Sequence, residues 1–157
     1  MEHTKQVNDD MVKVSFDLKE TGWKWKEEKM WAIPVNSNGE FRLDNIPLLV
    51  YGVSQGDIFL AELAEDGFFH FKSVIKRGGH STVRVHFKTD PIDLNIIRTY
   101  LDALNKFGCN YEGNGSTLYA LDIPAENDLS KIIGFLKEIE AKGVWEYEEG
   151  YIHKADN

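Results

Sequence analysis

The amino-acid sequence predicts an α+β fold in which a small N-terminal β-barrel-like module is followed by a ferredoxin-like (βαββαβ) module. In the first half of the 157 residues, short segments with a hydrophobic period of two predict strands, and no helical stripe precedes Thr89. The second half orders its predicted segments as strand, helix, strand, strand, helix and strand. We therefore expect modules at residues 11–79 and 80–153, a disordered tail at 1–10 and a short tail at 154–157.

The first module is expected to consist of strands joined by tight turns. The predicted strands cover residues 11–17, 29–35, 40–43, 57–64 and 68–77. Asn38-Gly39 is a hairpin signal between the second and third of these strands, because glycine adopts positive φ without steric cost. Across this hairpin, Trp31 and Phe41 are expected to face the core.

The second module contains two helix signals. Asp90 is expected to be the N-cap and Pro91 the first helical residue of a helix over 91–107, which Gly108 ends. A second amphipathic stripe predicts a helix over 127–142, ended by Gly143. The remaining strands are expected at residues 82–87, 109–112, 117–123 and 144–152.

Composition excludes several classes of protein. The 18 Lys and Arg residues are outnumbered by 26 Asp and Glu residues, which gives a net charge of −8 and argues against direct binding to nucleic acid. No apolar run approaches the roughly 20 residues of a membrane helix. The single cysteine, Cys109, cannot form an intrachain disulfide and is expected to be buried. The polar N-terminus lacks the apolar segment of a signal peptide, so we expect a cytoplasmic protein.

The negative charge is concentrated in the second half of the chain. Residues 1–89 contain 13 acidic and 12 basic side chains, a net of −1, whereas residues 90–157 contain 13 acidic and 6 basic side chains, a net of −7. Five glutamates lie within twelve residues of one another: Glu138, Glu140, Glu146, Glu148 and Glu149. They form either a solvated surface or a contact surface for a basic protein partner.

Tryptophans alternate with lysines in a short segment of the first module. Trp23 and Trp25 are each followed by a lysine. Such a pattern can bind single-stranded nucleic acid, but the acidic composition argues against that function here. The tryptophans are therefore expected either to pack on the barrel or to contact a protein partner, for which an exposed tryptophan is a strong anchor.

A glycine pair provides an alternative ligand site. Gly78-Gly79 could place backbone N–H groups around an anion, and His80 could act as a base oriented by Asp44 or Asp57. The competing interpretation is a flexible junction between the two modules. The histidines and the cysteine lack zinc-site spacing, so neither a metal nor any other cofactor is expected.

Several motifs together carry a family resemblance. They are residues 27–35 (EEKMWAIPV), 39–47 (GEFRLDNIP), 52–57 (GVSQGD) and 78–84 (GGHSTVR). On these motifs the chain resembles the bacterial family called domain of unknown function 4265, over about residues 11–150. That resemblance implies a small bacterial cytosolic protein without an established reaction. By analogy, its size, its charge and its lack of a catalytic motif resemble immunity proteins of contact-dependent and polymorphic toxin systems.

The expected function is that of an immunity protein, an antitoxin that is not an enzyme. It would occlude the active site of a cognate toxin domain, and a nuclease is expected because nuclease clefts are basic. Two alternatives remain open: a small-molecule-binding regulatory module, and an enzyme that uses His80.

Overall fold

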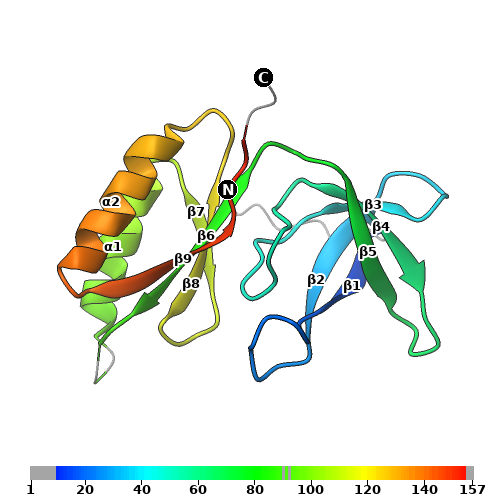
Figure 1. Cartoon of the computed structure of the whole chain (residues 1–157), viewed down its shortest axis with the longest axis horizontal. Coiled ribbons are helices and arrows are strands. Elements are labelled where there is room, and N and C mark those ends of the chain that lie inside the picture. The colour runs from blue at the N-terminus through cyan, green and yellow to red at the C-terminus, as the bar shows by residue number, and fades with distance from the viewer. Residues whose placement is uncertain (1–9, 90, 92, 155–157) are drawn as a thin grey trace, which may run out of the picture.

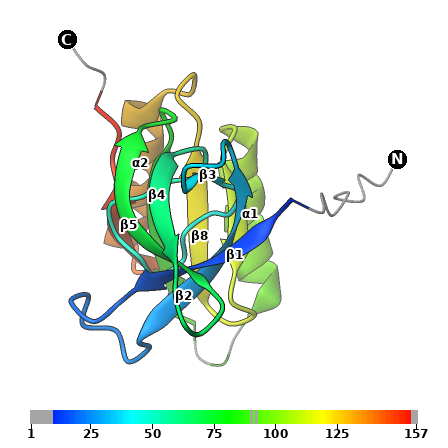
Figure 2. The ribbon, with the colours of Figure 1, turned by 90° about the vertical axis from the view of Figure 1, so that its right-hand side faces the viewer.

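The computed structural model describes residues 10–89, 91 and 93–154, and it has a mixed α+β fold. A closed five-stranded barrel is followed by a four-stranded sheet that two helices cover on one face (Figure 1). Seen from the barrel side, the molecule has the barrel in front, strands of the sheet behind it and the helices at the back (Figure 2). Of the predicted tails at residues 1–10 and 154–157, only Asp10 and Lys154 lie within the described residues.

The barrel is built from the strands that the period-two pattern predicts. Their bounds are β1 Val12–Asp17, β2 Glu27–Pro34, β3 Glu40–Leu43, β4 Ile58–Leu63 and β5 Phe69–Lys76. Neighbouring strands pair antiparallel, and a parallel pairing of β1 with β5 closes the barrel. Inward-facing aromatic rings fill the barrel, with the rings of Phe16 and Phe71 stacked at 4.9 Å.

One expected core residue of the barrel is exposed. Phe41 is buried, as predicted, but Trp31 lies on the outer face with 36% of its surface exposed. The prediction for Trp31 was wrong because its neighbours Met30 and Ala32 point inward, and alternate residues of a strand occupy opposite faces. The ammonium of Lys13 lies 4.5 Å from the centre of the Trp31 ring, on this outer face.

The second half forms the helix-covered sheet. Its elements are β6 Ser81–Phe87, α1 Leu94–Lys106, β7 Asn110–Gly113, β8 Leu118–Ile123, α2 Leu129–Ala141 and β9 Trp145–Tyr151. The strand order is β7-β8-β6-β9, and each pair of neighbours is antiparallel. Val83, Val85 and Phe87 pack beneath the helices. Throughout the described chain, predicted and observed bounds agree to within three residues.

The largest difference in bounds is at the start of α1. This helix begins at Leu94, and its N-cap is Asp93, whose carboxylate accepts hydrogen bonds from the N–H groups of Asn95 and Ile96. The predicted start at Pro91 was therefore wrong, and the predicted N-cap Asp90 lies outside the described residues. The predicted stop at Gly108 is confirmed, since that residue adopts a φ of 90° directly after the helix.

The open face of the sheet packs against the barrel. The segment between β3 and β4, residues 44–57, lies at this junction and bonds to the neighbouring strands β6 and β9. The hydroxyls of Ser54 and Thr82 are 2.6 Å apart, and the N–H of Gly52 donates to the carbonyl of Gly150 at 2.9 Å. Leu118 of β8 belongs to the hydrophobic cluster of the barrel. No described helix is long and apolar enough to cross a membrane.

Candidate functional site

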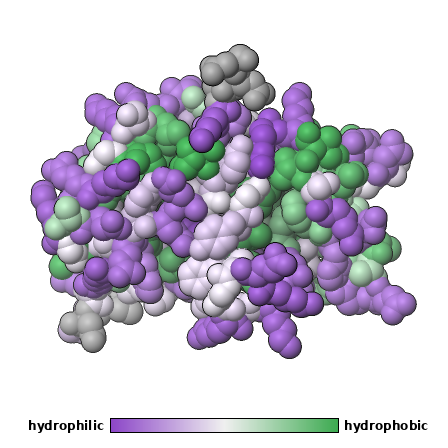
Figure 3. All heavy atoms as spheres, in the orientation of Figure 1, coloured by the Kyte–Doolittle hydropathy of each residue, from purple (hydrophilic) through white to green (hydrophobic). Residues whose placement is uncertain are grey.

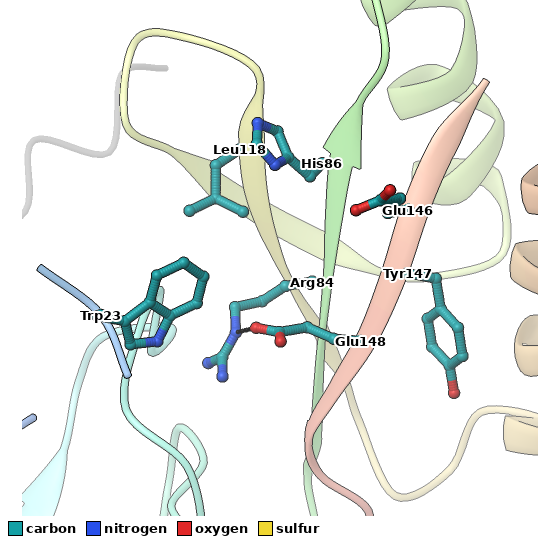
Figure 4. Close-up of a pocket in the computed structure, with 7 residues that line it drawn as sticks. All are labelled: Trp23, Arg84, His86, Leu118, Glu146, Tyr147 and Glu148. Carbon is teal, nitrogen blue, oxygen red and sulfur yellow. Dashed lines mark hydrogen bonds and ion pairs between the residues drawn. The ribbon is translucent and has the colours of Figure 1, made fainter. Parts of the chain in front are cut away.

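A cavity of about 270 Å³ lies where the barrel meets the open face of the sheet. It is lined by Trp23, Arg84, His86, Leu118, Glu146, Tyr147 and Glu148. Figure 4 shows Trp23 on the barrel side, opposite side chains from the three strands β6, β8 and β9, whereas the ring of Tyr147 points away from Trp23. The cavity thus combines an aromatic wall from one module with charged groups from the other.

Arg84 is the most unusual residue of this cavity, because its side chain is fully buried. Its Nε donates to Glu148 at 2.7 Å, and its Nη1 donates to the carbonyl of Val50 at 2.8 Å. Its guanidinium also lies over the ring of Tyr51, 4.6 Å from the ring centre. Its Nη2 has no hydrogen-bond partner among the residues described. A buried donor without a partner costs about 1–3 kcal/mol, and this cost distinguishes Arg84 from the other residues that line the cavity.

A glycine on β9, Gly150, leaves space for the guanidinium of Arg84. A Cβ added to Gly150 would lie only 2.9 Å from Nη1 of Arg84. The glycine therefore allows the strand backbone to approach the buried charge closely. The register of β6 with β9 places Arg84 directly opposite Glu148, which explains how the two side chains meet although 64 residues separate them.

The aromatic wall is held in place by hydrogen bonds. The indole N–H of Trp23 donates to the carbonyl of Leu49 at 3.0 Å. The carboxylate of Glu28 accepts from the backbone N–H groups of Leu48, Leu49 and Val50 at 2.8–3.1 Å. The bonds to Glu28 hold residues 48–50 in place, and this segment contains the Leu49 carbonyl to which Trp23 donates. Trp25, by contrast, is 44% exposed and does not line the cavity.

The five predicted glutamates are divided among three places. Glu146 and Glu148 line the cavity. Glu140 and Glu149 meet at Tyr147 instead, where Glu140 accepts from the backbone N–H at 2.6 Å and Glu149 accepts from the hydroxyl at 2.5 Å. Glu138 lies on α2 and pairs with Lys142 at 3.7 Å. The sequence cluster is therefore not one continuous acidic patch.

The local charges affect the phenol of Tyr147. Burial raises the pKa of Tyr147 most strongly, and its hydrogen bond to Glu149 and the charges of Glu149 and Glu140 raise it further. The pKa of Tyr51 is also raised, first by burial and then by its hydrogen bond to Glu148. Both phenols therefore stay protonated at neutral pH and act as hydrogen-bond donors.

The alternative site around His80 is organised differently from the prediction. Nδ1 of His80 lies 2.9 Å from both carboxylate oxygens of Asp122, a residue that was not predicted, and Asp122 therefore orients the ring. Asp57 is fully buried and accepts from Ser54 N–H, Gly78 N–H and Arg77. The assignment of Asp57 as a partner of His80 was wrong because its oxygens already stabilise the junction.

The glycine pair serves the packing of the chain. A Cβ added to Gly78 would lie 2.6 Å from the carbonyl oxygen of Gly56, so only glycine fits where these two backbone segments touch. We expected a ligand to approach the backbone closely at this glycine pair, but the backbone of Gly56 occupies that position at Gly78. Gly79 has a φ of 92°, which also favours glycine.

Asp122 was not singled out from the sequence, although a signal was present. A lone aspartate in the otherwise apolar strand β8 indicates a buried carboxylate that needs a partner. Burial raises the pKa of Asp122, and the hydrogen bond from His80 opposes that shift. Cys109 is buried, as predicted; burial, followed by the charge of Asp122, raises the pKa of its thiol to about 11. The thiol is therefore protonated and unreactive at neutral pH.

The cavity also contains residues that sequence reasoning did not select. Arg84, His86, Leu118 and Tyr147 come from three different strands, and no sequence motif links them. Within the described ranges, no group of three or more His, Cys, Asp or Glu side chains is placed to hold a metal ion.

Comparison with known proteins adds a family and a fold. The family model described as "Domain of unknown function (DUF4265)" matches residues 28–147. A crystal structure described as that of a hypothetical protein from Neisseria gonorrhoeae is similar, with a TM-score of 0.72 and 21% sequence identity. That similarity covers 93% of this chain and 96% of the other, and at this identity it shows a shared fold. No protein with a curated description matches the chain.

Proposed function

The chain belongs to the family of domain of unknown function DUF4265, and from this premise we propose that it is a protein-binding immunity protein that acts without catalysis. Its partner would be a cognate toxin domain, a nuclease with a basic active-site cleft, and the complex would form in the bacterial cytoplasm. Occlusion of that cleft would neutralise the toxin. We also propose that the second module is ferredoxin-like, since its chain order and the strand order β7-β8-β6-β9 fit that fold.

One observation carries the proposed function: both candidate contact regions border the same cavity. Trp23 comes from the tryptophan segment, and Glu146 and Glu148 come from the acidic cluster. A central aromatic anchor beside charged groups is the usual composition of an energetic hot spot in a protein interface. The sequence alone left these two regions as alternatives, whereas their proximity favours one combined contact surface.

Apolar side chains do not form one continuous area on the face shown in Figure 3. Apolar side chains form separate areas over the two modules, with polar side chains between them (Figure 3). Charge complementarity would then supply fast association, and a few anchors would set the lifetime of the complex. The net charge of −7 on residues 90–157 supplies the long-range attraction for a basic partner.

A small-molecule regulatory function is the second candidate. It is favoured by the unpartnered Nη2 of buried Arg84 beside a cavity of about 270 Å³. This volume is slightly below the range of about 300–1,000 Å³ that is typical of pockets for drug-sized ligands. A ligand would therefore have to be small.

The test begins with capture of the tagged protein's partner in its native host and identification by mass spectrometry. The purified partner's toxic activity is then measured with and without the chain, and association rates are measured against ionic strength by surface plasmon resonance. We expect Glu146→Gln/Glu149→Gln to reduce the association rate severalfold at low salt and to flatten its salt dependence. Both glutamates are exposed, so the fold should tolerate the change.

Two controls separate the alternatives. Removal of one charge from the barrel surface by Glu62→Gln should change the rate little, because Glu62 is exposed on the other module. His80→Ala should leave neutralisation of the toxin unchanged. Turnover of a metabolite that depends on His80, or a partner whose binding is independent of salt, would contradict the proposed function.

A further inference from the structure

We propose that the cavity between Trp23 and the sheet is a recognition pocket for one arginine side chain of the partner. The inference rests on the proposed function, since it names the group of a basic partner that would enter the acidic module. The pocket provides three things that a guanidinium requires: an aromatic ring, a carboxylate with free capacity and a space of side-chain size.

The charges that line the cavity favour a cation. One arginine and two glutamates give a formal charge of −1 when His86 is neutral. The positive charge of Arg84 is compensated by Glu148, whose oxygens accept from Arg84 at 2.7 Å and from the hydroxyl of Tyr51 at 2.7 Å. Glu146 therefore carries the uncompensated charge among the lining residues.

Glu146 is available to an incoming group. Its present partner is Lys88, with 3.5 Å between Nζ and Oε1, and the two side chains are 49% and 70% exposed. An ion pair this exposed contributes little free energy, so a guanidinium could replace the lysine at little cost. Neighbouring His86 lies opposite Glu146 in the β6–β9 register and offers a further hydrogen-bonding ring nitrogen.

Trp23 favours arginine over lysine. A flat guanidinium stacks on aromatic rings and is more weakly hydrated than an ammonium, so it loses less on entering a half-buried pocket. The hydrogen bond from the indole to Leu49 holds the ring at the cavity in advance.

The probe for this pocket is N-acetyl-L-arginine N-methylamide, which carries the guanidinium and two peptide carbonyls. The uncharged comparison is the citrulline analogue of the same shape. Binding to the full chain is followed by NMR, using the indole N–H of Trp23 and the backbone amides of β6 and β9. We expect the arginine probe to shift these signals and the citrulline probe to bind at least tenfold more weakly, as expected for loss of a charge-assisted contact. Equal affinity, or shifts confined to other surfaces, would overturn the proposal.

The chain offers a closely matched pair of variants. Glu146→Gln removes the carboxylate at the cavity, and Glu138→Gln removes one on α2 with a similar exposure and a similar lysine partner. We expect Glu146→Gln to weaken the arginine probe about tenfold and Glu138→Gln to leave its affinity unchanged. Equal weakening by both variants would show general attraction to an acidic protein and would refute a pocket.

A failure of the arginine pocket can be distinguished from a failure of the proposed immunity function. A captured toxin that is neutralised equally well by Glu146→Gln, together with no binding of the arginine probe, would refute the pocket and leave the immunity function standing. Specific binding of the probe without any protein partner in the host would support the pocket and refute the immunity function.

Discussion

Two fully buried charged side chains, Asp57 and Arg84, lie at the junction between the barrel and the sheet, and they differ in how completely they are bonded. Asp57 accepts hydrogen bonds on both oxygens, from two backbone N–H groups and from Arg77. Arg84 leaves one nitrogen without a partner among the described residues and borders a cavity. Asp57 thus joins segments of the chain with all of its bonds made, whereas Arg84 keeps one nitrogen without a hydrogen bond beside the cavity.

The same contrast explains why the sequence-based assignment of Asp57 as a partner of His80 was wrong. Asp57 follows a glycine in a conspicuous motif and was expected to assist His80. Its two carboxylate oxygens instead accept hydrogen bonds from the backbone N–H groups of Ser54 and Gly78 at the junction of the modules. Arg84 ends the motif at residues 78–84, but the alternation of its strand predicts only an outward-facing polar residue, and its burial became visible only in the structure. A buried polar atom without a hydrogen-bond partner needs an explanation, and this is the reason that Arg84 rather than Asp57 enters the proposed pocket.

The largest effect on stability is expected from Asp57→Ala. This change leaves the N–H groups of Ser54 and Gly78 without their acceptor and removes the ion-pair partner of Arg77, which keeps its bond to the carbonyl of Gly52. It should lower the free energy of unfolding by about 3–5 kcal/mol. Arg84→Met should cost less, about 1–3 kcal/mol, because it also removes a buried nitrogen that has no partner.

Urea unfolding of the parent and both variants measures this difference, with Glu62→Ala as the control. Glu62 pairs with Lys72 at 3.7 Å on the surface and should change stability by well under 1 kcal/mol. A larger loss for Arg84→Met than for Asp57→Ala would contradict the distinction between the fully bonded Asp57 and the incompletely bonded Arg84.

The next effect concerns the backbone contact beside Asp57. Gly78→Ala places a methyl group against the carbonyl of Gly56, where only 2.6 Å is available, and should cost about 1–3 kcal/mol. Gly134→Ala is the counterpart in α2, where nothing lies within 4 Å of the added atom, and it should raise stability by up to about 1 kcal/mol. Thermal unfolding of both variants tests the pair, and a neutral Gly78→Ala would indicate that the junction yields easily.

The smallest effect is a pH dependence that arises from Asp122. Its pKa in the folded chain lies above 3.8 because burial disfavours the charged form, so the folded state binds this proton more tightly than the unfolded state. Its contribution to stability should therefore fall as pH rises from 3.8 to the raised pKa and stay constant above it. Asp122→Asn should remove this fall while keeping an acceptor for His80. Unfolding free energies measured on both sides of that range test this, and identical pH profiles would exclude Asp122 as the source.

Much of the fold follows from local pattern. Alternation of apolar and polar residues predicts the strands of both sheets, because successive side chains of a strand point to opposite faces. The helices are predicted by apolar residues that recur about every 3.6 residues and by residues that end a helix, such as Gly108. Cys109 was expected to be buried from its position after a helix-ending glycine, and it is. These features depend on interactions between residues that are close in sequence.

The candidate site could not be predicted in the same way. In β6 the alternation correctly separates Val83 and Val85 from Arg84 and His86, but it does not reveal what covers the polar face. The barrel covers that face at Arg84 and leaves His86 exposed, so two polar residues of one strand have opposite environments. Likewise, the glutamates near the C-terminus are close together in the sequence, but the register of β6 with β9 places only Glu148 opposite Arg84.

The sequence by itself thus determined which residues form strands and helices and which of them share a face. Only the tertiary structure decided which polar face is buried, which carboxylate meets Arg84 or His80, and that Trp23 and Glu146 border one cavity. The physical reason is that periodicity reflects local geometry, whereas the partner of a buried charge is set by the packing of segments many residues apart.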